Sequence, residues 1–254
     1  MLLGSDGMRI SIELSSEKEV ILPIHYNNIL QGFLYKNLTD KDYRTFLHDT
    51  GYQLADKRFK LFTYSRLLGK FRMLKDTGII AFSSPITLVV AAGVEPFITD
   101  LAETLIKSER CYLGDNPVDI KSISVHKKFT PTDKVQIKML SPIVAHRTIF
   151  EGEKKRTEYY SPWQKEFGQL VTNNLLRKYQ IIHGNLPENL DFRVIPNGNQ
   201  ESKFARVINY KEFFIKGYAG IYWLKGNPDL IEVAYNTGLG SKNSQGFGCW
   251  EVVG

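Results

Sequence analysis

Hydrophobic and polar positions in the first half of the chain change their period several times, and each change predicts an element. The stretch RISIEL, residues 9–14, alternates polar and apolar side chains, which indicates a strand. In NNILQGFLYKNL, residues 27–38, apolar positions such as Leu30, Phe33 and Leu34 recur at helical spacing. The following residues predict a short helix within 40–56, strands over 60–68 and 78–86, an amphipathic helix over 94–108 and a strand over 118–125. The order β-α-β-β-α-β is the ferredoxin-like pattern.

The pattern then restarts after a break. HKKFTPTDK, residues 126–134, is polar and contains proline, so we expect a linker there. The remaining residues predict strands over 135–140, 190–196 and 249–253, further strands between 205 and 223, and helices over 161–179 and 228–237. Ser161 is the expected N-cap of the first helix, with Pro162 at its first position and Gln164 completing a capping box. Asn227 is the expected N-cap of the second helix.

Both halves of the chain therefore repeat one element order. This predicts an α+β protein with two tandem ferredoxin-like domains, each βαββαβ with an antiparallel sheet. We expect an N-terminal domain over 8–126 and a C-terminal domain over 134–254. No repeat is visible in the sequence itself, so this prediction depends on element order alone.

The stretch GLGSKNSQGFGCWEVV, residues 238–253, carries four glycines between a predicted helix and a predicted strand. It matches neither a Walker loop nor a dinucleotide fingerprint, because Asn243 stands where the latter needs its third glycine. A helix C-cap would explain Gly238, because glycine tolerates positive φ. It would leave Lys242 and Ser244 unexplained, so a ligand-facing loop and a structural turn remain alternatives.

The composition narrows the class of protein. The 254 residues are 43% hydrophobic, but no run approaches the 18 apolar residues that a membrane span needs. The opening MLLGSDG has neither a basic leader nor an apolar stretch, so we expect no signal peptide and a cytoplasmic protein. Cys111 and Cys249 are isolated and match no metal or redox spacing, and we expect neither a metal nor a cofactor.

The formal net charge of +6 is moderate, but basic residues gather locally. KRFKLFTYSRLLGKFRMLK, residues 57–75, has seven basic side chains, no acidic one and four aromatic rings. Such a mixture suits a nucleic acid, because cations neutralise phosphates and rings stack on bases. The alternative is a pair of strands with a charged outer side. EKKRTEYY, residues 153–160, is a second and weaker basic cluster.

Four passages together resemble the CRISPR-associated endoribonucleases that cut precursor CRISPR RNA within its repeats, which belong to the repeat-associated mysterious protein superfamily. The passages are LPIHYNNILQGFLYKNL at 22–38, FLHDTGY at 46–52, KLFTYS at 60–65 and GLGSKNSQGFG at 238–248. The last is similar to the family's C-terminal glycine-rich signature. The resemblance implies two tandem ferredoxin-like domains, with the glycine-rich loop packed between them and shaping the RNA-binding face.

The resemblance also implies a metal-independent reaction in which the ribose 2′-hydroxyl attacks the adjacent phosphate. It maps His48 to the family's catalytic histidine, Lys60 to its lysine and Tyr35 to its tyrosine. We expect His48 to act as general acid or base, Lys60 to stabilise the phosphorane, and Tyr35 to orient or transfer a proton. His48 and Lys60 are twelve positions apart, so the segment between them must then fold back on itself. His25 is the main rival histidine. We expect His126, His146 and His183 to be structural or surface residues, with contact to RNA as the alternative for His146, which lies beside Arg147.

For RNA binding we expect basic and polar residues from three places: Lys57, Arg58, Arg66 and Arg72, then Lys154, Lys155 and Arg156, then Lys242, Asn243 and Ser244. The expected partner is CRISPR repeat RNA, with other subunits of a CRISPR interference complex as further candidates. We expect a monomer or a homodimer that does not bind membranes. Two other functions remain open, namely a repeat-RNA-binding subunit that does not cleave and a scaffold that binds proteins or small molecules.

Overall fold

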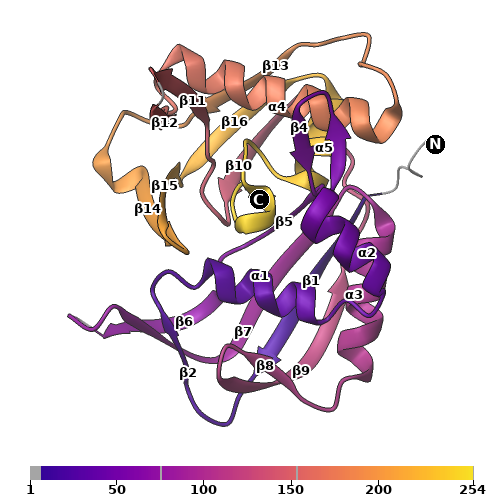
Figure 1. The fold of residues 1–254 in the computed structure, drawn as a ribbon, viewed down its shortest axis with the longest axis vertical. Helices are drawn as coiled ribbons and strands as arrows, with labels where there is room; N and C mark the ends of the chain where they lie inside the picture. Colours follow the sequence, from indigo (N-terminus) through magenta and orange to yellow (C-terminus); the bar gives the residue numbers. More distant parts are fainter. Residues whose placement is uncertain (1–6, 75, 153, 254) are drawn as a thin grey trace.

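The computed structural model describes residues 7–74, 76–152 and 154–253. The first half of the chain forms the lower part of the molecule in Figure 1 and the second half forms the upper part. None of the described helices is both long and apolar enough to cross a membrane.

The first half builds one sheet with two helices against it. Its elements are β1 (Met8–Ser15), β2 (Val20–Pro23), α1 (Asn27–Lys36), α2 (Lys41–Thr45), η1 (Phe46–Thr50), β3 (Tyr52–Leu54), β4 (Lys57–Phe59), β5 (Phe62–Tyr64), β6 (Leu68–Leu74), β7 (Ile79–Ala92), α3 (Glu95–Lys107), β8 (Cys111–Leu113) and β9 (Asn116–Val125). The strand order is β2-β7-β1-β9-β8, and β5 and β6 also pair with β7. Alternate residues of β1 share one apolar core with α1 and α3, including Ile10, Leu34 and Phe97.

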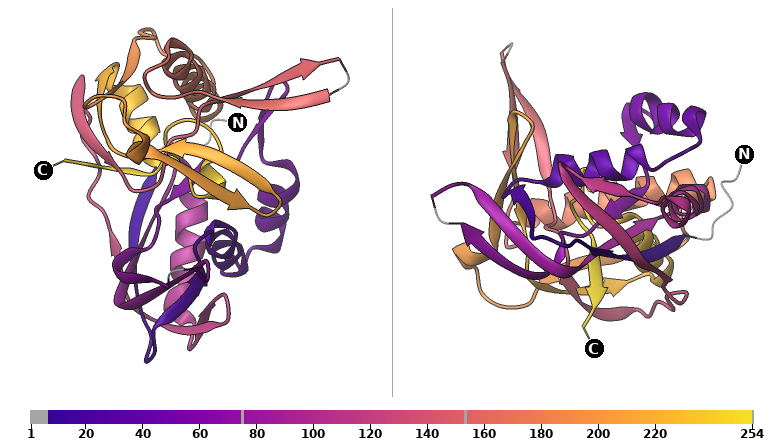
Figure 2. Two further views of the ribbon diagram at one scale, coloured as in Figure 1. Left: turned by 90° about the vertical axis from the view of Figure 1, so that its left-hand side faces the viewer. Right: turned by 90° about the horizontal axis from the view of Figure 1, so that it is seen from below.

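The second half builds a four-stranded sheet and two hairpins. Its elements are β10 (Lys134–Met139), β11 (His146–Glu151), β12 (Lys154–Tyr159), α4 (Lys165–His183), β13 (Phe192–Pro196), η2 (Ser202–Phe204), β14 (Ala205–Tyr210), β15 (Phe213–Tyr218), β16 (Ile221–Gly226), α5 (Pro228–Thr237), η3 (Asn243–Gln245) and β17 (Trp250–Val252). The strand order is β13-β16-β10-β17. The β11–β12 and β14–β15 hairpins stand outside this sheet, and Figure 2 shows the first extending away from the body of the molecule.

Both sheets have the ferredoxin-like arrangement. The first and third strands of each βαββαβ unit lie side by side in the centre, as β1 with β7 and as β10 with β16. Each of these pairs is antiparallel. The predicted fold class, two tandem ferredoxin-like units with antiparallel sheets, is therefore confirmed.

Several predicted boundaries were wrong. The strand expected over 78–86 extends from Ile79 to Ala92 as β7. The strand expected over 60–68 is divided between β5 and the start of β6. The helix expected over 161–179 begins at Lys165, with Gln164 rather than Ser161 as its N-cap. Only half of a capping box forms, because the Gln164 side chain accepts a hydrogen bond from the Ser161 N–H. The N-cap predicted at Asn227 is present, since its side chain accepts a hydrogen bond from the Asp229 N–H at 2.9 Å.

The glycine-rich loop, residues 238–248, lies between the two halves and contacts both (Figure 1). From the first half, the Asn27 side chain donates to the carbonyls of Gln245 and Gly246, and the Thr63 hydroxyl donates to that of Phe247. Gly246 has φ +83°, and a Cβ there would meet the Asn27 amide and a Tyr64 ring carbon, each at 2.7 Å. This glycine therefore permits both the turn and the close approach of the first half.

Candidate active site

His48 lies on η1, a single π-helical turn that extends α2. Its side chain is 73% exposed, and its Nδ1 lies 2.5 Å from a carboxylate oxygen of Asp49. The turn ends at Gly51, where the N–H donates to the Phe46 carbonyl and φ is +64°. A Cβ on Gly51 would lie 2.6 Å from the Phe59 carbonyl oxygen, so the chain can fold back this tightly only at glycine.

The short β3–β4 hairpin supplies the return path that the sequence could not reveal. It pairs Tyr52 with Phe59, so the chain returns to η1 within a few residues. Lys60 follows the hairpin, and its Nζ donates a hydrogen bond to the His48 carbonyl at 3.0 Å. The same Nζ lies 5.5 Å from the centre of the Tyr35 ring, and the Tyr35 and His48 ring centres are 6.2 Å apart. The structure thus brings the three predicted catalytic residues together.

Partial burial changes the acid–base properties of two of these side chains. The Tyr35 hydroxyl is buried and has no hydrogen-bond partner among the described residues. Burial raises the pKa of Tyr35 well above its usual value, so the phenol stays protonated and can donate. Burial also lowers the pKa of Lys60, with Asp49 acting in the opposite direction.

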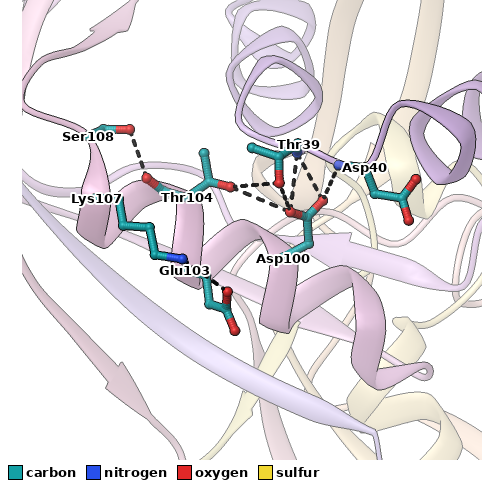
Figure 3. Close-up of polar contacts among 7 residues, drawn as sticks. All are labelled: Thr39, Asp40, Asp100, Glu103, Thr104, Lys107 and Ser108. Atoms are coloured by element: carbon teal, nitrogen blue, oxygen red, sulfur yellow. Dashed lines mark hydrogen bonds and ion pairs between the residues drawn. The ribbon is translucent and has the colours of Figure 1, made fainter.

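An anchor on α3 holds the segment that carries His48. The Asp100 carboxylate accepts hydrogen bonds from the Thr39 hydroxyl at 2.5 Å and from the N–H groups of Thr39 and Asp40 (Figure 3). Asp40 in turn caps α2, since its side chain accepts from the Tyr43 N–H at 2.9 Å. These bonds tie the start of α2, and so the base of η1, to the first-half core.

A cleft of about 840 Å³ opens beside Lys60, between the two halves of the protein. Its cationic lining comes from β4, the β11–β12 hairpin, α4 and the glycine-rich loop: Lys57, Arg58, Lys60, Arg147, Lys155, Arg177, Lys178 and Lys242. Asp56 is the single acidic residue that lines it within the described part of the chain. Such a cleft attracts an anionic chain, because low-dielectric walls focus the field of like charges.

The residues predicted to bind RNA divide between this cleft and other places. Those that line the cleft are Lys57, Arg58, Lys155, Lys242, Asn243 and Ser244. Lys154 and Arg156 are neighbours of Lys155 on β12. Arg66 instead donates to the Asn27 side chain at 2.6 Å and stacks on Tyr26, beside a separate pocket of about 310 Å³. Arg72 lies on β6 and pairs with Glu19.

Sequence reasoning missed Lys178, which is only 2% exposed. Its Nζ donates to the carbonyls of Thr237, Gly238 and Gly240 and to the Asn243 side-chain oxygen, the last at 2.6 Å. Burial lowers the pKa of Lys178 to about 7. Asn243 is therefore a buried link between Lys178 and the loop. The only signal in the sequence is a lysine at a core-facing position of α4, where helical spacing would favour an apolar residue.

Arg147, Arg177 and His146 were also missing from the predicted set of RNA-binding residues, although His146 was noted as a candidate for contact. All three line the cleft. Among the described residues, no group of three His, Cys, Asp or Glu side chains lies close enough to hold a metal ion.

Comparison with known proteins gives the same family as the sequence motifs. Residues 123–252 match the family model described as CRISPR associated protein Cas6, C-terminal. The chain is 25% identical to CRISPR-associated endoribonuclease Cas6 1 of Methanocaldococcus jannaschii, covering 96% of this chain and 92% of that protein. It is 29% identical to CRISPR-associated endoribonuclease Cas6 of Pyrococcus furiosus, covering 97% of this chain and 90% of that protein.

A solved structure shows the same fold over the whole chain. The protein of a Cas6-related gene from Pyrococcus furiosus superimposes with a TM-score of 0.84 at 24% identity, covering 98% of this chain and 99% of that one. The matched family model spans just over half of the 254 residues. Because this match and the tandem ferredoxin-like fold agree, the chain belongs to the CRISPR-associated Cas6 family.

Proposed function

We propose that this protein is an endoribonuclease that cleaves precursor CRISPR RNA within its repeats, without a metal ion, and so generates guide RNAs. The observation that carries the proposal is the cluster of His48, Lys60 and Tyr35, in which Lys60 also lines the cationic cleft. Two of the relatives are named CRISPR-associated endoribonuclease Cas6, and these names support the same reaction class.

The proposed reaction is a transesterification within the RNA, which transfers a phosphoryl group from the 5′-oxygen of one nucleotide to the 2′-oxygen of the preceding one. The ribose 2′-oxygen attacks the adjacent phosphorus and loses its proton to a base. The bond from phosphorus to the 5′-oxygen breaks, and an acid protonates that oxygen. The products are a 2′,3′-cyclic phosphate and a 5′-hydroxyl. The chemistry therefore needs a base, an acid and a positive charge near the phosphorane.

The geometry supports one role for each side chain. The Asp49 carboxylate contacts Nδ1 of His48. Nε2 of this exposed ring is therefore left to exchange a proton with the RNA. Lys60 supplies positive charge beside it. Tyr35 keeps its proton, and its ring lies beside Lys60 Nζ and the His48 ring, so it orients these two groups rather than acting as a base. The cleft cations then hold the phosphates on either side of the cut.

The test is a denaturing gel with labelled repeat RNA from the same genome, in EDTA. Parallel reactions contain His48→Ala, His25→Ala and an RNA with a 2′-deoxy nucleotide at the cut site. His25 is a matched control because it lines the separate pocket with Arg66 rather than the cleft with Lys60. We expect one cut, abolished by His48→Ala and by the 2′-deoxy substitution but not by His25→Ala.

The other outcomes each change the proposal in a defined way. Loss of cleavage with His25→Ala alone would keep the reaction and move the catalytic histidine. Tight binding of the repeat without a cut in any reaction would overturn the nuclease proposal and leave a guide-RNA-binding subunit.

A further inference from the structure

His146 occupies the wall of the cleft that the second half supplies, away from the cluster around His48. It is the first residue of β11, and its ring packs against Tyr159 on β12 with 5.8 Å between the ring centres. Its Nδ1 lies 2.8 Å from the hydroxyl of Ser241 in the glycine-rich loop. Two segments 95 residues apart in the sequence are thus joined through one imidazole.

The surroundings of Ser241 decide which ring nitrogen carries the proton. The Ser241 hydroxyl oxygen also lies 3.1 Å from the Val144 carbonyl oxygen, which can only accept. The single hydroxyl proton therefore goes to Val144, and the Ser241 oxygen accepts a hydrogen bond from Nδ1–H of His146. The Ser241 N–H donates to the same carbonyl at 2.9 Å, which holds the serine in place. The neutral ring then has a lone pair on Nε2.

The ring stays neutral at physiological pH. Burial, followed by the positive charges of Lys242 and Lys57, lowers the pKa of His146 to about 4. The remaining titratable group against the ring, the Tyr159 hydroxyl, is occupied as a donor to the Phe214 carbonyl. A neutral imidazole with a bare Nε2 is an acceptor, so it cannot bind a phosphate oxygen and requires a donor.

No described residue donates a hydrogen bond to Nε2 of His146. A cleft built only to hold phosphates would need donors and cations. An acceptor without a described donor on the lining of this cleft therefore suits a ligand that brings a donor.

We propose that His146 is a specificity-determining residue whose Nε2 accepts a hydrogen bond from one nucleoside of the bound RNA. This inference rests on the proposed function, because it takes repeat RNA as the ligand. The donor is either a ribose 2′-hydroxyl or an N–H of a base. Phosphate contacts are independent of sequence, whereas a contact to a 2′-hydroxyl distinguishes RNA from DNA and a contact to a base edge distinguishes one base from another.

The first experiment measures the equilibrium affinity for repeat RNA that carries a 2′-deoxy nucleotide at the cut site, so that cleavage plays no part. We expect His146→Ala to weaken binding about tenfold, as the loss of one hydrogen bond with an unpaired partner predicts. His146→Gln, whose amide oxygen reaches the position of Nε2, should restore most of that loss. His126→Ala is the matched control, because His126 pairs with Ser11 outside the cleft and should bind like wild type.

The second experiment identifies the donor. Wild type and His146→Ala are titrated with repeats that carry single 2′-deoxy substitutions, or single base analogues without an exocyclic amino group. One position should weaken binding by wild type but not by His146→Ala. A 2′-deoxy position of this kind identifies the ribose, and a base-analogue position identifies the base. If no position shows this coupling, the proposal is overturned.

The third measurement uses the unmutated protein and so does not depend on the folding of any variant. Nitrogen-15 NMR of the labelled histidines should show His146 with the proton on Nδ1, and the Nε2 signal should shift when RNA is added. A proton on Nε2, or a signal unchanged by RNA, would overturn the proposal. Failure of the nuclease proposal would instead appear in the cleavage gel, while these binding and NMR results stayed as expected.

Discussion

The Nζ of Lys60 donates a hydrogen bond to the carbonyl of His48 at 3.0 Å, although the two residues are twelve positions apart in the sequence. This bond makes the position of the ammonium group depend on η1, the turn that also carries the His48 ring. The histidine and the positive charge are therefore fixed relative to each other before RNA binds. Such preorganisation is valuable because it costs no rearrangement at the moment of reaction.

Removing the charge of Lys60 should slow cleavage with little effect on folding. We expect Lys60→Met to lower kcat about 100- to 1000-fold, as the loss of one electrostatic stabiliser does in other enzymes. A lysine carries its charge only below its pKa, and burial lowers that pKa here. The wild-type rate should therefore fall at a less alkaline pH than an ordinary lysine would give. The Lys60→Arg variant should stay charged at alkaline pH, so its cleavage rate should not fall there. A pH profile identical to that of wild type would contradict the proposed electrostatic role of Lys60.

Tyr35→Phe removes the hydroxyl and keeps the ring, so it tests these two parts of the Tyr35 side chain separately. The Tyr35 hydroxyl is buried without a described partner, so its removal leaves no unpaired group behind. We expect the melting temperature to stay the same or rise and kcat to stay close to that of wild type, because the ring beside Lys60 and His48 is kept and the buried hydroxyl does not reach the RNA. Thermal unfolding and single-turnover cleavage measure the two effects. A large fall in kcat would instead show that the Tyr35 hydroxyl itself takes part in the reaction.

Asp100 should influence cleavage although it lies outside the cleft. Asp100→Ala removes the acceptor that holds Thr39 and Asp40 at the start of α2 (Figure 3). We expect kcat to fall about tenfold with the affinity for RNA unchanged, because a small misplacement of a catalytic group is costly. Glu103→Ala on the same helix is the control, since Glu103 forms only an exposed pair with Lys107. Equal effects of the two substitutions would show that the anchor has no special role.

Lys178→Met should loosen the glycine-rich loop. The substitution leaves the Gly238 carbonyl and the Asn243 side-chain oxygen without their buried donor. We expect the free energy of unfolding to fall by about 2 kcal/mol and binding of the uncleavable repeat to weaken. Lys165→Met, at the exposed start of the same helix, should change neither quantity. Chemical denaturation and equilibrium binding are the measurements.

The salt dependence of RNA binding should distinguish cleft cations from other basic residues. Replacing Arg147 or Arg177 by Gln should reduce the slope of log affinity against log salt by about 1 for each phosphate that the protein no longer neutralises. Arg72→Gln should leave the slope unchanged, because Arg72 lies on β6 in a pair with Glu19 rather than in the cleft. A change with Arg72→Gln of the same size would place the RNA path over β6.

Local sequence signals were sufficient wherever a short stretch decides its own structure. Alternation predicted β1, helical spacing predicted α1 and α3, and Asn227 as N-cap predicted the start of α5. The start of α4 was misplaced because a distant contact overrides the local signal. The Trp163 indole donates to the Gly198 carbonyl, and Ser161 to Gln164 form a turn before the helix begins.

The sequence by itself determined the order of the ferredoxin-like elements and the tandem fold, and its motifs gave His48, Lys60 and Tyr35 as the candidate catalytic residues. Only the tertiary structure decided which side chains share a site. A π-helical turn and a hairpin bring Lys60 to His48, while Arg66 and Arg72 are engaged elsewhere, and Lys178 and His146 face the glycine-rich loop. The physical reason is the distance along the chain over which each signal acts. Periodicity reflects neighbours within a turn or a strand, whereas these contacts join segments distant in the chain and depend on how the two halves pack.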